Sequence, residues 1–253
     1  MIGYTTIGNG KEGVIVLEGW FGDYTAFDPM IPFLDTDTFT YAFMDYRGYG
    51  KSKEIQGNHT MQEIAQDAFA LADHLDWQKF HVIGHSMGGM ALMRMAANNV
   101  SRIKSGVALC AVPASGVPFD DDTDALFSGA IENDENRKTI IHYTTGNRLS
   151  DQWVSWRVGK SRESTNQKAF ADYLTAWTKT NFLEETKGVE FPLLVCTGEH
   201  DLALGPETMK QTYMEWYPNA KLEVVPNAGH YPMQETPVYL ATVLEYFMRE
   251  QAK

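Results

Sequence analysis

Cysteine is scarce in this chain of 253 residues, which contains only two. Cys110 and Cys196 each lie at the end of a short apolar run, at 107–110 and 193–196. Small secreted scaffolds held together by disulfides carry many more cysteines in a shorter chain, so that class is excluded. We expect both cysteines to be buried free thiols in a reducing compartment.

Long apolar runs are also missing. No window approaches the roughly 18 consecutive apolar residues that a transmembrane helix requires. The N-terminal segment 1–6 has neither the basic region nor the apolar stretch of a secretory signal peptide. These absences predict a cytoplasmic protein that does not bind membranes.

Positive charge is in short supply, with 21 Lys and Arg against 33 Asp and Glu, which gives a net charge of −12. The acidic residues are spread over many short runs and form no acidic tail. Such a surface repels nucleic-acid phosphates and anionic lipid headgroups, so neither is an expected partner. A small-molecule substrate is the expected partner, and the oligomeric state is left open.

Apolar residues make up 43% of the chain, enough to build a substantial core. Six short apolar runs are typical of strands covered on both faces, because most lack polar alternation. Helical patterns separate several of them, one beginning with a capping box at 60–63 and one with Thr236 and Pro237. This alternation predicts an α/β fold with a mostly parallel central sheet flanked by helices. The six runs are 14–17, 41–44, 81–84, 107–110, 193–196 and 222–225.

The segment from Pro113 to Lys187 interrupts this alternation. It has no convincing strand, but it has patches of helical spacing and nine aromatic residues. One interpretation is a helical subdomain whose aromatic side chains form their own small core, and the other is a lid whose inner face lines an apolar pocket. We predict a core made of residues 1–112 and 188–253, with a helical cap inserted at 113–187.

The most specific motif is Gly-His-Ser-Met-Gly-Gly at 84–89. It follows an apolar strand and precedes a helical pattern, which is the context of a G-x-S-x-G nucleophile elbow. Glycines are needed there because side chains would collide with the flanking backbone. The helix that begins at Met87 directs its amide groups toward Ser86, which favours a developing anion. Ser86 is the candidate nucleophile, and the alternative is a glycine-rich turn with an idle serine.

A serine nucleophile needs a histidine base that a third group orients. Among the seven histidines, His230 is the best placed, in a turn-rich loop after the run 222–225. This loop reaches the carboxyl edge of the sheet, where active sites of open α/β folds lie. His85 is adjacent to Ser86, but we expect the turn to point its side chain elsewhere.

The orienting acid is expected in the loop after the run 193–196. Asp201 and Glu199 both lie in this loop, and Asp201 is the deeper of the two. His200 suggests a metal site, but no H-x-x-x-H or H-E-x-x-H pair accompanies it, so no metal is expected. The chain order of serine, acid and histidine is that of the α/β-hydrolases.

The chain resembles the α/β-hydrolases, within the group that contains esterases, lactonases and C–C hydrolases. Besides the elbow, the resemblance rests on Asp-Tyr-Arg-Gly-Tyr-Gly-Lys-Ser at 45–52 and on Ala-Gly-His at 228–230, followed by Glu-Thr-Pro at 235–237. It covers nearly the whole chain except the segment 113–187, which would be the cap. The resemblance therefore implies an α/β-hydrolase fold.

The resemblance also implies a role for each candidate residue. Ser86 would be the nucleophile, His230 the base and Asp201 the acid. The oxyanion hole would consist of the backbone N–H groups of Met87 and Trp20.

The loop 17–22 departs from the family at one position. It reads Leu-Glu-Gly-Trp-Phe-Gly, and Glu18 stands where the family normally has histidine. Glu18 either forms a local hydrogen bond in the loop or changes proton handling and substrate preference near the oxyanion site.

These residues predict a carboxylesterase-like serine hydrolase that forms an acyl-enzyme and requires no metal or organic cofactor. The aromatic-rich cap favours a small to medium, largely apolar ester or lactone. C–C bond hydrolysis and perhydrolysis are alternatives with the same triad, and a non-enzymatic receptor for a small ligand is an alternative on the same fold. The expected pocket residues are Trp20, Phe21, Trp153, Trp156 and Trp177.

Overall fold

The computed structural model describes residues 1–252 and contains a seven-stranded sheet with the order β1-β3-β2-β4-β5-β6-β7. Strand β1 is antiparallel to β3, and all the other neighbouring strands are parallel. The mostly parallel sheet is therefore confirmed, and the six predicted runs lie in β2 to β7, except that the run 107–110 extends one residue past the end of β5. The strands are β1 (Tyr4–Ile7), β2 (Glu12–Leu17), β3 (Phe39–Met44), β4 (Phe80–His85), β5 (Ile103–Leu109), β6 (Leu193–Gly198) and β7 (Ala220–Val225).

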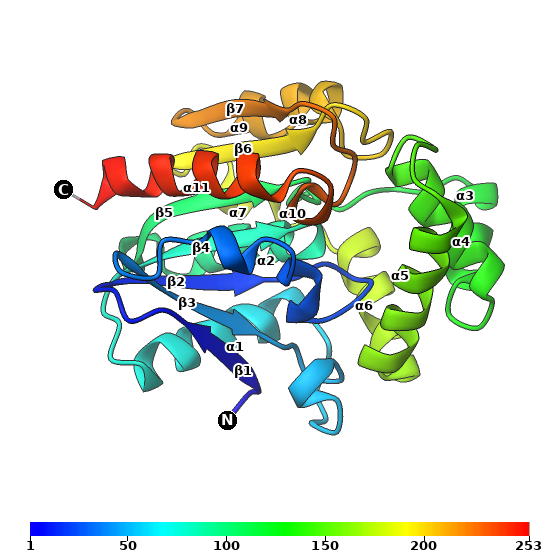
Figure 1. Ribbon diagram of the computed structural model, residues 1–253, viewed down its shortest axis with the longest axis horizontal. Helices are drawn as coiled ribbons and strands as arrows, with labels where there is room; N and C mark the ends of the chain where they lie inside the picture. Colours follow the sequence, from blue (N-terminus) through cyan, green and yellow to red (C-terminus); the bar gives the residue numbers. More distant parts are fainter. Residues whose placement is uncertain (253) are drawn as a thin grey trace.

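Helices cover both faces of this sheet (Figure 1). Helices α1 (Met61–His74) and α2 (Met87–Asn99) pack against each other on one face, and α11 (Pro237–Gln251) lies on the other. The remaining helices are α3 (Asp121–Gly129), α4 (Asp134–Thr144), α5 (Asp151–Ser164), α6 (Gln167–Lys179), α7 (Leu183–Thr186), α8 (Pro206–Gln211), α9 (Tyr213–Trp216) and α10 (Pro232–Glu235). Short 3₁₀ turns are η1 (Tyr24–Phe27), η2 (Ile31–Phe33), η3 (Gly50–Ser52) and η4 (Val100–Arg102).

The two predicted helix starts differ in how they are capped. The Thr60 hydroxyl accepts a hydrogen bond from the Glu63 N–H at 3.1 Å, as the capping box predicts for α1. Helix α11 begins at Pro237 as expected, but the Thr236 side chain makes no capping hydrogen bond there. Thr236 is the N-cap residue of α11 as predicted, but its hydroxyl donates to the Pro232 carbonyl of the preceding helix α10 at 3.5 Å instead of capping α11.

The segment 113–187 contains α3 to α7 and no strand of the sheet within the described chain. In Figure 1, α3 to α6 stand together beyond the ends toward which the arrows of β2 and β6 point. Helix α7 instead packs against α2. The insertion thus places four helices over the carboxyl edge of the parallel strands.

Cys110 and Cys196 are both buried and free, as expected. Burial in the core raises the pKa of both thiols above their usual range. In residues 1–252 no helix combines the length and the apolar character needed to cross a membrane.

Candidate active site

Ser86 lies on the turn between β4, which ends at His85, and α2, which begins at Met87. Its backbone has φ 53° and ψ −116°, a left-handed conformation that a residue with a side chain rarely adopts. The conformation is held from both sides, because the Ser86 N–H donates to the Leu109 carbonyl at 2.8 Å and its carbonyl accepts from Val112 N–H at 3.0 Å. The turn that the sequence motif predicts is present.

The glycines around Ser86 permit this turn by allowing close backbone contacts. A Cβ on Gly84 would collide with the Gly88 carbonyl oxygen, and a Cβ on Gly88 would lie 2.5 Å from the Leu17 carbonyl oxygen. Real Cβ atoms do not approach other atoms this closely, so both positions require glycine. The spacing of the motif thus reflects the packing of α2 against the end of β2.

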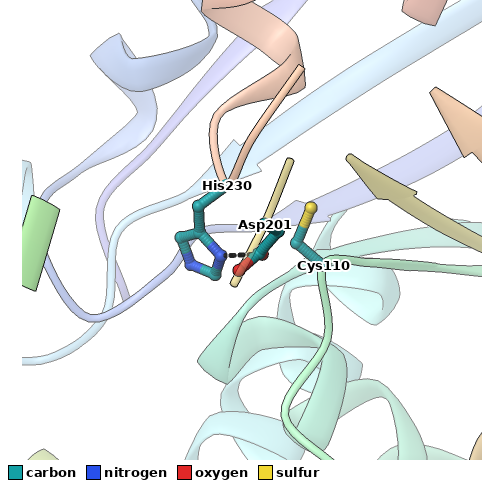
Figure 2. Close-up of side chains that lie close together, drawn as sticks. All are labelled: Cys110, Asp201 and His230. Carbon is teal, nitrogen blue, oxygen red and sulfur yellow. Dashed lines mark hydrogen bonds and ion pairs between the residues drawn. The ribbon is translucent and has the colours of Figure 1, made fainter. Parts of the chain in front are cut away.

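His230 and Asp201 meet at the same edge of the sheet (Figure 2). His230 Nδ1 lies 2.6 Å from Asp201 Oδ2, and both side chains are buried. The other carboxylate oxygen of Asp201 accepts hydrogen bonds from the N–H groups of Ala203 at 2.9 Å and Leu204 at 3.0 Å. Because a carboxylate accepts, Nδ1 is the donor of this pair, and in the neutral imidazole Nε2 is then the nitrogen that can accept a proton.

Ser86 and His230 line one cavity, which lies between the sheet edge and the inserted helices. Most of its wall is apolar, and Trp20, Phe21 and Trp177 contribute to it as expected. Trp153 and Trp156 do not line it, which corrects the predicted pocket. Trp156 is 43% exposed and Trp153 packs edge-on against Tyr231.

Helix α5 turns other residues inward in place of these two tryptophans. Its buried residues are Val154, Arg157, Val158 and Ser161, which share one helical face. Arg157 lines the cavity. Sequence reasoning missed Arg157 because it assumed that the aromatic residues of α5 would face the pocket.

The loop after β2 carries the amide of Trp20 and lies beside the elbow. Tyr46 donates its hydroxyl to the Glu18 carbonyl at 2.6 Å, and Tyr49 donates to the Trp20 carbonyl at 2.8 Å. The indole N–H of Trp20 donates to the Phe170 carbonyl at 2.7 Å, and its ring stacks on Phe170. Two tyrosines from the segment 45–52 and one inserted helix therefore fix this loop.

The amides of Trp20 and Met87 make no hydrogen bond to another group among residues 1–252. A buried N–H group without an acceptor is uncommon. Trp20 lines the cavity, and Met87 directly follows Ser86 in the chain but does not itself line the cavity. Both positions are therefore suited to bind a negatively charged oxygen at Ser86.

Tyr49→Phe removes the hydroxyl that holds the Trp20 carbonyl. We expect kcat to fall about tenfold, because the Trp20 N–H remains but is less firmly oriented. The lost hydrogen bond should also lower the free energy of unfolding by about 1 kcal/mol. Steady-state kinetics on an activated ester and urea unfolding measure the two effects. Tyr41→Phe is the control, because it removes a buried hydroxyl bonded to Glu245, a residue that does not line the cavity. Equal losses of kcat in both variants would contradict this role for Tyr49.

His85 lies closer to the site than expected. Its Nδ1 is 2.8 Å from Glu18 Oε1, its Nε2 is 2.8 Å from the His230 carbonyl oxygen, and its ring lines the cavity. As expected, the ring nitrogens of His85 contact groups other than Ser86, although the ring still lines the cavity. His85 thus links Glu18 to the backbone of His230.

Glu18 forms the local hydrogen bond that the sequence allowed, because its Oε1 accepts from the Gly19 N–H at 2.7 Å. It also pairs with His85. Burial acts to raise the pKa of Glu18, but the charges of His85 and Arg157 hold the pKa below its ordinary value.

The inserted segment also holds the loops that carry Asp201 and His230. The Thr144 carbonyl accepts from the His230 N–H at 3.1 Å, and the Tyr143 hydroxyl donates to the Leu202 carbonyl at 3.2 Å. Arg148 forms an ion pair with Glu235 at 3.0 Å. The Glu235 carboxylate accepts hydrogen bonds from the backbone N–H groups of the residues on both sides of His230. The Glu-Thr-Pro motif therefore supports the histidine loop.

Three side chains place possible metal-ligating atoms within 4.8 Å of one another, and they are those of Cys110, Asp201 and His230 (Figure 2). The donor set suits a metal poorly. The Cys110 thiol donates to the Gly229 carbonyl, and burial raises its pKa well above the usual range, so the sulfur stays protonated. His230 Nδ1 is already engaged with Asp201.

Comparison with known proteins places the chain in a family. The sequence profile of the alpha/beta hydrolase fold family matches residues 13–237, and the chain belongs to this family. It is similar to a non-heme haloperoxidase from Rhodococcus erythropolis, at 24% identity over 90% of this chain and 88% of the relative. It is also similar to a bifunctional esterase/perhydrolase from Acinetobacter calcoaceticus, at 26% identity over 84% of this chain and 82% of the relative.

The fold itself is shared with solved structures. An esterase from Exiguobacterium antarcticum superposes with a TM-score of 0.86 at 19% identity, covering 98% of this chain and 95% of that one. At this identity the likeness establishes the α/β-hydrolase fold, as the resemblance implied.

Proposed function

We propose that the protein is a serine hydrolase that cleaves small to medium, largely apolar carboxylic esters or lactones. The observation that carries the proposal is that Ser86, on its strained turn, lines the same cavity as His230, whose ring is bonded to Asp201. Nucleophile, base and orienting acid are the three roles that acyl transfer to water requires. The membership of the family supports hydrolysis as the reaction class.

In the proposed mechanism, Ser86 Oγ attacks the substrate carbonyl carbon while His230 Nε2 takes its proton. The Trp20 and Met87 amides bind the oxygen that becomes negative, and Asp201 stabilises the imidazolium. The imidazolium then gives its proton to the leaving alkoxide. Water, activated by His230, attacks the acyl-enzyme and releases the acid and free Ser86.

The helices α3 to α6 are proposed to be the cap that selects the substrate. They supply Phe127, Ile140 and Trp177 to the cavity wall, and the walls of apolar side chains favour apolar acyl groups. Helix α7 packs on α2, so we place it with the core.

A panel of p-nitrophenyl esters and simple lactones tests the proposal, together with labelling by a fluorophosphonate probe. We expect turnover of short and medium acyl chains and labelling of Ser86. Hydrogen peroxide added to the ester assays tests perhydrolysis, which one relative also performs. Absence of both turnover and labelling in folded protein would exclude the proposal. A large ligand-induced rise in Tm without turnover would support the receptor alternative.

A further inference from the structure

Arg157 is a buried cation with two guanidinium nitrogens that lack a hydrogen-bond acceptor. Its side chain, from the middle of α5, is 1% exposed. Its Nε and Nη2 atoms have no hydrogen-bond acceptor among residues 1–252. Burying a charged donor without a partner is costly, so such a group in a native fold requires an explanation.

A second buried arginine shows how this fold satisfies a guanidinium when its role is structural. Arg137 of α4 is also 1% exposed. Its Nε donates to the Ala130 carbonyl at 2.7 Å, its Nη1 donates to Ser161 Oγ at 2.6 Å, and its guanidinium lies 4.0 Å from the Phe170 ring centroid. Arg157 has no comparable set of acceptors, which sets it apart from a structural arginine.

The free donors of Arg157 are at the candidate active site. Arg157 lines the cavity that contains Ser86 and His230. The opposite loop leaves space for it at Gly22, where a Cβ would lie 2.8 Å from Nη2. The guanidinium also lies 5.1 Å from the ring centroid of Tyr231. Arg157 is thus held in place by packing while its Nε and Nη2 atoms have no hydrogen-bond partner.

Among residues 1–252, no carboxylate forms a direct ion pair with Arg157, although Glu18 is near enough for the charge of Arg157 to lower its pKa. Glu18 is the only acidic side chain that lines the cavity, and it forms no ion pair with Arg157 in the described residues. Glu18 Oε1 already contacts the Gly19 N–H and His85 Nδ1, whereas its Oε2 makes no hydrogen bond. A ligand carboxylate supplies the acceptors that Nε and Nη2 of Arg157 lack.

We propose that Arg157 binds a carboxylate of the substrate that is separate from the ester carbonyl attacked by Ser86. The substrates would then be esters or lactones that carry a free carboxylate on an otherwise apolar skeleton. The planar guanidinium fork matches a carboxylate, and the apolar walls strengthen the interaction by excluding water. This inference rests on the proposed function and makes the substrate class more specific.

Two matched pairs of esters test the proposal on both sides of the scissile bond. On the acyl side, p-nitrophenyl hemiglutarate is compared with p-nitrophenyl 5-methylhexanoate, in which an isopropyl group replaces the carboxylate. On the leaving-group side, 4-acetoxybenzoate is compared with 4-isopropylphenyl acetate. In at least one pair, Arg157→Met should lower kcat/KM for the acid roughly 10- to 100-fold, mainly through KM, with little change for the neutral ester.

Arg162→Met is the matched control, because Arg162 is on the same helix but pairs with Asp134 and does not line the cavity. It should leave the acid-to-neutral ratio of kcat/KM unchanged. Glu18→Gln should move that ratio in favour of the acid, opposite to Arg157→Met, because it removes the one negative charge that faces the cavity. Equal losses for acidic and neutral esters in Arg157→Met would overturn the proposal and show that Arg157 only balances Glu18.

Binding separates this proposal from the proposed function. Calorimetry with Ser86→Ala protein, which is expected not to turn over esters, measures the affinity for the same four compounds. Tighter binding of one acid than of its neutral partner, lost when Arg157→Met is added, supports the carboxylate site even if no ester is hydrolysed by the unmodified protein. Equal affinity within both pairs overturns it even if the protein proves to be an active esterase.

Discussion

Ser86→Ala is expected to lower kcat on activated esters by about 10⁴- to 10⁶-fold, because it removes the atom that forms the acyl-enzyme. The residual rate would come from the Trp20 and Met87 amides and from substrate binding. Fluorophosphonate labelling should be lost completely. Steady-state kinetics and intact-protein mass spectrometry measure both results.

The fold should survive this substitution. Alanine keeps the backbone hydrogen bonds of Ser86 to Leu109 and Val112, and the Ser86 hydroxyl makes no side-chain cap for α2. We therefore expect a Tm close to that of the unmodified protein. Ser115→Ala is the control, since Ser115 lies in the loop after β5 and does not line the cavity with Ser86. Retention of more than about a hundredth of kcat in Ser86→Ala would mean that another group is the nucleophile.

The strands that the sequence predicts are those covered on both faces. In β4 and β6 every residue is buried, so neither sequence shows the regular polar alternation of a half-buried strand. Strand β1 has only four residues, pairs antiparallel at the edge of the sheet and has no buried side chain. Its sequence, Tyr-Thr-Thr-Ile, therefore carried too weak a pattern to be predicted.

The meeting of His230 with Asp201, and of both with the cavity at Ser86, follows from the same geometry. Each residue lies just after a strand, and β4, β6 and β7 are parallel and end at one edge. The positions of strand ends and turn residues in the sequence were therefore enough to predict that Ser86, Asp201 and His230 lie near one another. Their catalytic roles remain the proposal that the Ser86 and Asp201 variants test.

The contacts of Arg157 and His85 could not be predicted in the same way. Helix α5 has apolar residues on more than one side, so its periodicity does not decide whether Trp153 or Arg157 faces the cavity. That choice depends on packing against Gly22 and Tyr231, which are far away in the sequence. The lining of the cavity thus depends on long-range packing of the insertion, whereas the position of the elbow depends on local pattern.

Asp201→Asn is expected to lower kcat by about 10⁴-fold through the tautomer of His230. Asp201 Oδ1 accepts from the N–H groups of Ala203 and Leu204, so an asparagine carbonyl oxygen must take this place. The amide NH₂ then faces His230 Nδ1 and donates to it. The imidazole is forced to carry its proton on Nε2, where it can no longer accept the proton of Ser86.

Glu199→Gln discriminates this effect from a general loss of negative charge in the same loop. The Glu199 side chain is half exposed, and its Oε2 accepts from the Asn227 N–H at 3.1 Å. We expect kcat to stay within about twofold of the unmodified protein, as for other surface substitutions. The NMR signals of the imidazole nitrogens should show the proton on Nε2 in Asp201→Asn and on Nδ1 in Glu199→Gln. If Glu199→Gln abolished turnover and Asp201→Asn did not, Glu199 would be the acid that orients His230.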